Sequence, residues 1–137
     1  MSIKQAIDSP KHSKKLHLNY IKRMGPYLGT PNTEKDSENG ECSGSKWGAT
    51  SMQGWRKSQE DAHIANTDLP DGVSCFAVFD GHGGKEVSIF VKAVFCQELI
   101  KLEEYKNKQY EKALSKAFLR MDVMMKEPEG IAKLKEI

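Results

Sequence analysis

The sequence has few cysteines and no long apolar run. Its three cysteines form no Cys-x-x-Cys pair and no zinc spacing, and their odd number excludes a fully paired disulfide framework. We therefore expect a reducing intracellular compartment, the cytoplasm or the nucleus. No stretch approaches the about 20 apolar residues that a membrane span needs, and the N-terminus lacks the apolar core of a secretory signal.

A strong charge of one sign is also missing. The net charge is +2, but residues 1–23 hold six lysine and arginine residues against one acid, so the remainder is net acidic. A nucleic-acid-binding protein would carry the basic surface on its folded body. The sequence therefore predicts no nucleic-acid partner and no membrane span.

Composition divides the 137 residues into three regions. Residues 1–23 are interpreted as a basic, flexible N-terminal extension, with a short helix or a targeting or anion-binding arm as alternatives. Residues 24–45 are rich in Gly, Pro, Asn, Ser and Glu and have too little apolar surface to order themselves, which predicts a polar linker. Residues 46–137 show the apolar periodicity of a folded domain.

Three strands followed by helices are predicted within this domain. The strands are expected over residues 47–54, 61–67 and 73–79, with short links that favour antiparallel pairing of consecutive strands. The third of them, VSCFAVF, is apolar on both faces, which suits a strand that is covered on both sides.

Beyond residue 84, apolar residues recur at steps of three and four, as in amphipathic helices. Helices are predicted from 87 to 103 and from 110 to 125, the second ending before Pro128. We interpret their apolar stripes as packing surfaces. The order of elements predicts an α+β fold in which helices cover one face of an antiparallel sheet.

A glycine-rich corner, Asp80-Gly81-His82-Gly83-Gly84, follows the third strand. An acid at the end of an apolar strand needs solvent, a basic side chain or a metal ion as its partner. The glycines allow a sharp turn and let backbone carbonyls approach a ligand. An Asp-Gly pair in this place is also typical of an ordinary turn, so the residues upstream must decide between these alternatives.

A second polar cluster lies upstream, in GWRKSQEDAH over residues 54–63. Antiparallel pairing would bring Glu60 and Asp61 to the edge at which Asp80 leaves its strand. Three neighbouring carboxylates repel one another, and Mg²⁺ or Mn²⁺, which prefer oxygen ligands, would relieve the repulsion. With Arg56 and a histidine nearby, the cluster indicates metal-assisted phosphoester hydrolysis. A solvated charge cluster on a small α+β domain is the alternative.

The motifs SMQGWRKSQEDAH and CFAVFDGHGG, in this order and separated by a short turn, resemble those of the PPM family. These are metal-dependent serine/threonine protein phosphatases, also called type 2C. The resemblance covers residues 25–125 and is strongest over 47–86. It implies a type 2C β-sandwich, with two antiparallel sheets flanked by α-helices, that acts on phosphorylated protein substrates.

The resemblance also implies a metal site for two Mg²⁺ or Mn²⁺ ions. Asp80 would bridge the two ions, and the Gly81 carbonyl would help to hold one of them. Glu60 would bind through the water shell of a metal, and Asp61 would orient waters.

The remaining roles concern the substrate. Arg56 would bind its phosphate, and His82 would be the general acid that protonates the leaving alcohol. Metal-activated water would attack phosphorus directly, without a phosphoenzyme intermediate. His63 has no family role and is interpreted as structural or exposed.

The chain departs from the family in its later part, where the family supplies further metal-binding aspartates. After Asp80 the sequence has one aspartate, Asp122, within the second predicted helix. We therefore expect the N-terminal portion of the phosphatase domain, with self-association or pairing with a missing C-terminal half. The alternative function is that of a catalytically inactive phosphatase fold that acts as a binding or regulatory protein.

Overall fold

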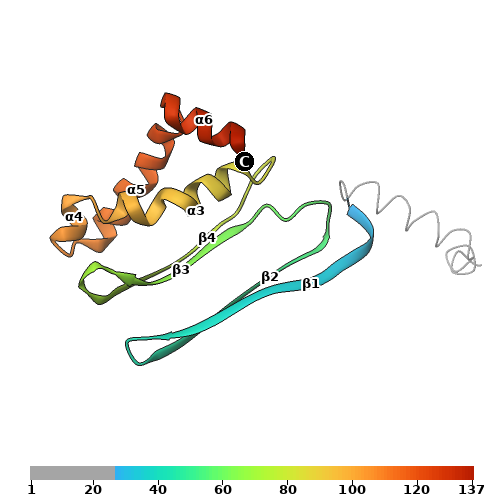
Figure 1. Ribbon diagram of the computed structural model, residues 1–137, viewed down its shortest axis with the longest axis horizontal. Helices are drawn as coiled ribbons and strands as arrows, with labels where there is room; N and C mark the ends of the chain where they lie inside the picture. The colour runs from blue at the N-terminus through green and yellow to red at the C-terminus, as the bar shows by residue number, and fades with distance from the viewer. Residues whose placement is uncertain (1–26) are drawn as a thin grey trace, which may run out of the picture. The chain divides into compact units, whose positions relative to one another are not determined.

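The computed structural model describes residues 27–137 of the chain. The predicted basic extension over residues 1–23 lies outside this described part. Figure 1 shows the elements in chain order. The strands are β1 (Tyr27–Cys42), β2 (Ser45–Arg56), β3 (Ala62–Leu69) and β4 (Val73–Phe79), and a short 3₁₀ turn, η1 (Pro70–Gly72), joins the last two. The helices are α3 (Glu86–Leu99), α4 (Glu103–Lys106), α5 (Tyr110–Met124) and α6 (Pro128–Glu136).

The described residues fall into two compact units. Residues 27–35 with 52–58 form one unit, and residues 36–51 with 59–137 form the other. Both units include parts of the β1–β2 hairpin, whose strands pair as a two-stranded sheet. The turn of this hairpin belongs to the second unit. Its two residues, Ser43 and Gly44, have φ angles of 46° and 80°, as a two-residue turn of the primed type requires.

The expected linker over residues 24–45 is wrong for most of its length, because residues 27–42 form strand β1. The side chains of β1 are mostly exposed, as its composition predicts. The order comes from pairing with β2, which satisfies the backbone N–H and C=O groups without apolar burial. Polar contacts between the strands add to it, such as the one between the Ser37 and Thr50 hydroxyls at 2.8 Å.

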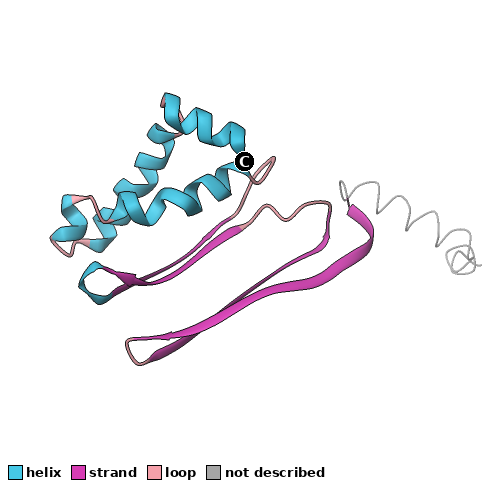
Figure 2. Cartoon of the chain, viewed as in Figure 1, coloured by secondary structure: helices cyan, strands magenta, loops and turns pink. Residues whose placement is uncertain are grey.

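Strands β3 and β4 form a separate two-stranded antiparallel sheet within the second unit (Figure 2). The expected pairing is therefore confirmed for these two strands, whereas β2 pairs with β1 and not with β3. Strand β4 is apolar on both faces, but the expected cover on both sides is wrong for residues 27–137, because only one face is buried. Phe79 is buried on one face, while Phe76 and Val78 on the other are 52% and 75% exposed. The Trp47 ring contacts Phe76, with ring centroids 5.7 Å apart.

Helix α3 packs on β3 and β4, and α5 packs on α3. Phe90 and Phe95 of α3 are fully buried, and the Phe95 ring lies 5.4 Å from that of Phe79. The α+β fold with helices on one face of an antiparallel sheet is thus observed. Helix α3 ends at Leu99 and not near residue 103, because Leu102 takes an extended conformation before α4.

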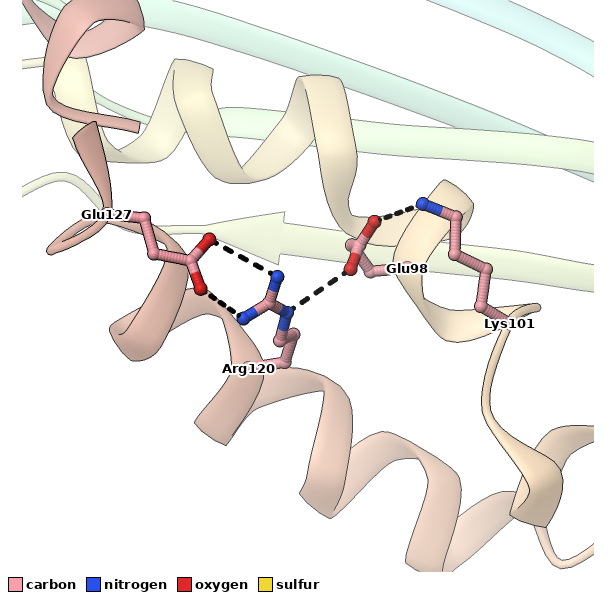
Figure 3. A network of polar contacts seen from close by, with 4 residues as sticks. All are labelled: Glu98, Lys101, Arg120 and Glu127. Carbon is pink, nitrogen blue, oxygen red and sulfur yellow. Dashed lines mark hydrogen bonds and ion pairs between the residues drawn. The ribbon is translucent and has the colours of Figure 1, made fainter. Parts of the chain in front are cut away.

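An ion-pair network joins α3, α5 and the start of α6, as Figure 3 shows. The Arg120 guanidinium donates to both carboxylate oxygens of Glu127, at 2.7 and 3.3 Å, and to Glu98 at 3.4 Å. Glu98 also accepts a hydrogen bond of 2.5 Å from Lys101. The hydrogen bond from Lys101, with the smaller effect of Arg120, lowers the pKa of the Glu98 carboxyl. These contacts link α3, α5 and the start of α6 to one another.

Candidate metal and phosphate site

The candidate site lies at the edge of the second sheet where β3 begins and β4 ends. The last residue pair of the register is Ala62 opposite Phe79. Asp61 comes directly before this pair and Asp80 directly after it, so antiparallel pairing brings both acids to one edge. Both residues are exposed. Figure 1 shows the loop that leads from this edge into α3.

Glu60 packs closely against the glycine-rich corner. Its carboxylate oxygen Oε2 accepts a hydrogen bond of 3.3 Å from the backbone N–H of Gly84. Its backbone carbonyl accepts a hydrogen bond from the hydroxyl of Ser88, in the first turn of α3. A side chain at position 81 would collide with the Glu60 carbonyl oxygen and would lie 2.8 Å from the Glu60 Cβ. Glycine at this position therefore allows the close approach of Glu60 to the corner.

A cavity of about 400 Å³ opens beside this edge. Asp80, Gly81 and His82 line it from the end of β4, and Ser88 and Asp122 line it from α3 and α5. Neither Ser88 nor Asp122 is among the site residues predicted from the sequence. Local sequence carries no signal for either, because their proximity arises from the packing of α3 and α5 and not from a motif.

Arg56 and His63 are the remaining residues of the upstream motif. Arg56 is the last residue of β2, belongs to the first unit and is exposed, and its carbonyl accepts a hydrogen bond of 2.8 Å from the Gln53 side chain. The structure does not place it relative to the acids of the second unit. His63 lies with its Nε2 2.8 Å from a carboxylate oxygen of Glu38. This contact suits the structural role expected for His63.

The residues of the second unit match part of a site for Mg²⁺ or Mn²⁺. The Asp80 and Glu60 carboxylates and the Gly81 carbonyl are the oxygen ligands that these ions prefer. Within residues 27–137, however, no group of three or more His, Cys, Asp or Glu side chains is arranged to hold a metal ion. The expected close convergence of three carboxylates is therefore wrong: the acids share an edge but do not form a compact cluster.

A family model described as protein phosphatase 2C matches residues 45–135. This match contains both motifs and all the helices except the last residue of α6. The chain belongs to the protein phosphatase 2C family. The resemblance inferred from the two motifs is thus confirmed, and it extends beyond residue 125.

Relatives of the chain include phosphatases of this family from a ciliate and a plant. The chain is 49% identical to probable protein phosphatase 2C 6 of Paramecium tetraurelia over 114 residues, which cover 83% of this chain and 39% of that protein. It is 50% identical to probable protein phosphatase 2C 21 of Arabidopsis thaliana over 107 residues, or 78% of this chain and 30% of that protein. The chain thus spans less than half the length of these protein phosphatase 2C relatives. No helix within residues 27–137 is long and apolar enough to cross a membrane.

Proposed function

We propose that this chain takes part in the metal-dependent hydrolysis of phosphoserine and phosphothreonine monoesters in proteins. The observation that carries the proposal is the placement of Glu60 and Asp80 at one edge of the β3–β4 sheet, beside the Gly81 corner, in a member of the protein phosphatase 2C family. The substrates would be phosphorylated proteins.

The metal-binding part of the proposal assigns four residues. The Asp80 carboxylate and the Gly81 carbonyl would hold Mg²⁺ or Mn²⁺ directly, Glu60 would act through the water shell, and Asp61 would orient waters. When bound, such ions acidify a water enough for it to act as a nucleophile near neutral pH. The described residues supply only part of a ligand set, so this chain by itself would hold one ion, with waters in the remaining positions of its shell, and a second ion would require further ligands.

The remaining roles fall to Arg56 and His82. A guanidinium offers two parallel donors to a phosphate, which orients it and offsets its charge. His82 is exposed and lines the same cavity as Asp80, where its imidazolium would donate a proton to the leaving alcohol.

Manganese-dependent phosphate release tests the proposal. The purified chain would be incubated with a phosphothreonine peptide and Mn²⁺, in parallel with Asp80→Asn and with Asp68→Asn as a matched control. Asp68 is exposed on β3, outside the candidate site, and its removal tests for a general effect of losing one carboxylate. We expect release by the wild-type chain and by Asp68→Asn, and its loss in Asp80→Asn.

Two other outcomes would count against the proposal. Release that persists in Asp80→Asn would contradict the metal role of this residue. If the wild-type chain binds the phosphopeptide but releases no phosphate with Mn²⁺, the result would favour the alternative, a phosphatase fold that acts as a binding or regulatory protein.

A further inference from the structure

Ser88 is a buried polar residue of α3, with 2% of its surface exposed. A buried hydroxyl is costly unless it is hydrogen-bonded. The Ser88 hydroxyl has a single proton, which is shared between two carbonyls within hydrogen-bond distance: that of Lys85 at 2.9 Å, in the first turn of α3, and that of Glu60. The first contact is local. The second contact joins α3 to the segment that leads into β3. It therefore involves Glu60, a residue of the candidate site.

Close packing alone does not require a hydroxyl at this position. The buried small residues of the neighbouring helix α5, Ala113 and Ala117, are alanines with no exposed surface. Alanine also favours a helix more than serine does. The hydroxyl of Ser88 therefore calls for an explanation beyond its size, and its bond to Glu60 supplies one.

Glu60 is held from two sides by the segment that follows β4. The Ser88 hydroxyl binds its backbone carbonyl, and the Gly84 N–H binds its carboxylate at 3.3 Å. Gly81 leaves the space for this approach. These contacts hold Glu60 against the glycine corner that directly follows Asp80 in the chain.

We propose that Ser88 is a positioning residue for metal binding, which acts by holding the Glu60 carboxylate in place beside Asp80. This role rests on the proposed function, because it concerns how tightly the edge holds Mg²⁺ or Mn²⁺. Residues that orient the ligands of a metal typically change its affinity about 10- to 100-fold when they are removed. Ser88 would not touch the metal or the substrate.

Titration of the 137-residue chain with Mn²⁺, followed by the EPR signal of the free ion, tests the role. Ser88→Ala removes the hydroxyl, and Ser88→Thr retains it. Ser115→Ala is the matched control, because the Ser115 hydroxyl also donates to a carbonyl of its own helix, that of Glu111 at 3.1 Å, but on an exposed face of α5. We expect about tenfold weaker binding in Ser88→Ala, and near wild-type binding in Ser88→Thr and Ser115→Ala.

Hydrogen exchange of the Gly84 amide gives a second readout, in the absence of metal. Loss of the Ser88 hydroxyl should loosen Glu60, so the Gly84 N–H should exchange faster in Ser88→Ala and remain protected in Ser115→Ala. Far-UV circular dichroism checks that each variant is folded. Should Ser88→Ala lose its helical signal, Ser88→Cys takes its place, because a thiol is only somewhat larger than a hydroxyl and is a weak donor.

The outcomes separate the two proposals. Equal Mn²⁺ affinity of folded Ser88→Ala and wild type, or unchanged Gly84 exchange, would overturn the positioning role and leave the proposed function standing. A wild-type chain that binds no Mn²⁺ would overturn the metal site itself, and the role of Ser88 with it.

Discussion

Substitution of Gly81 by alanine tests the close packing on which the candidate site depends. A Cβ at this position would collide with the Glu60 carbonyl oxygen and would lie 2.8 Å from both the Glu60 Cβ and the Gly84 carbonyl oxygen. All three neighbours are backbone atoms or a Cβ, so no flexible side chain can turn aside. The segment before β3 or the glycine corner must therefore move.

The size of the effect follows from this overlap. Extra methyl groups in well-packed regions typically cost about 1–3 kcal/mol, and we expect the free energy of unfolding of Gly81→Ala to fall by this amount. Gly29→Ala is the matched control, because Gly29 lies in β1 and has no atom within 4 Å of its added Cβ. Neither glycine has a left-handed φ, so backbone strain does not enter the comparison.

Urea unfolding followed by circular dichroism gives the free energies of unfolding of wild type and both variants. The Mn²⁺ titration described for Ser88 then shows whether the movement also weakens metal binding, which we expect since Glu60 is the residue displaced. If Gly81→Ala were as stable as Gly29→Ala, Glu60 would not pack against the corner in solution, and the close approach that both the metal site and the role of Ser88 require would be absent.

Two further predictions concern the helices and the sheet behind the site. The carboxyl of Glu98 has a lowered pKa, from the hydrogen bond with Lys101 and then that with Arg120. Its ion pairs should therefore stabilise the fold above the ordinary value of 4.5, and this stability should be lost as the pH falls below it. Glu98→Gln should flatten the dependence of the unfolding free energy on pH in this range, and an unchanged acid profile would contradict the network. Burial, with the neighbouring Cys96 thiol, raises the pKa of Cys75 to about 11, so iodoacetamide at about pH 8 should modify Cys75 roughly a hundredfold more slowly than a free cysteine peptide. Peptide mass spectrometry measures the rates, and comparable rates would contradict the burial of this thiol.

Much of the fold could be predicted because it depends on local patterns. The apolar run of β4 ends at Phe79, directly before the acid and glycines that terminate it. The steps of three and four that predicted the second helix match α5, and Pro128 begins the next helix, as the fixed φ of proline allows. The two motifs likewise sufficed for the family, because their residue types and order are specific.

Strand pairing could not be predicted in the same way. Residues 27–42 have the composition of a linker, and they form a strand because β2 offers its backbone groups as partners. For the same reason β2 pairs with β1, although the short link to β3 suggested otherwise. Which strands pair depends on the relative free energies of the alternative pairings, and these cannot be read from the sequence of one segment.

At the candidate site, the chemical groups could be predicted from the two motifs alone: their acids, a glycine corner and a histidine. The packing of distant segments placed Glu60 against Gly81 and within hydrogen-bond distance of Ser88, a serine with no motif of its own. It also decided that Asp122 lines the cavity of Asp80. Composition and periodicity act through nearest neighbours along the chain, whereas a site is made by contacts between segments that only packing brings together.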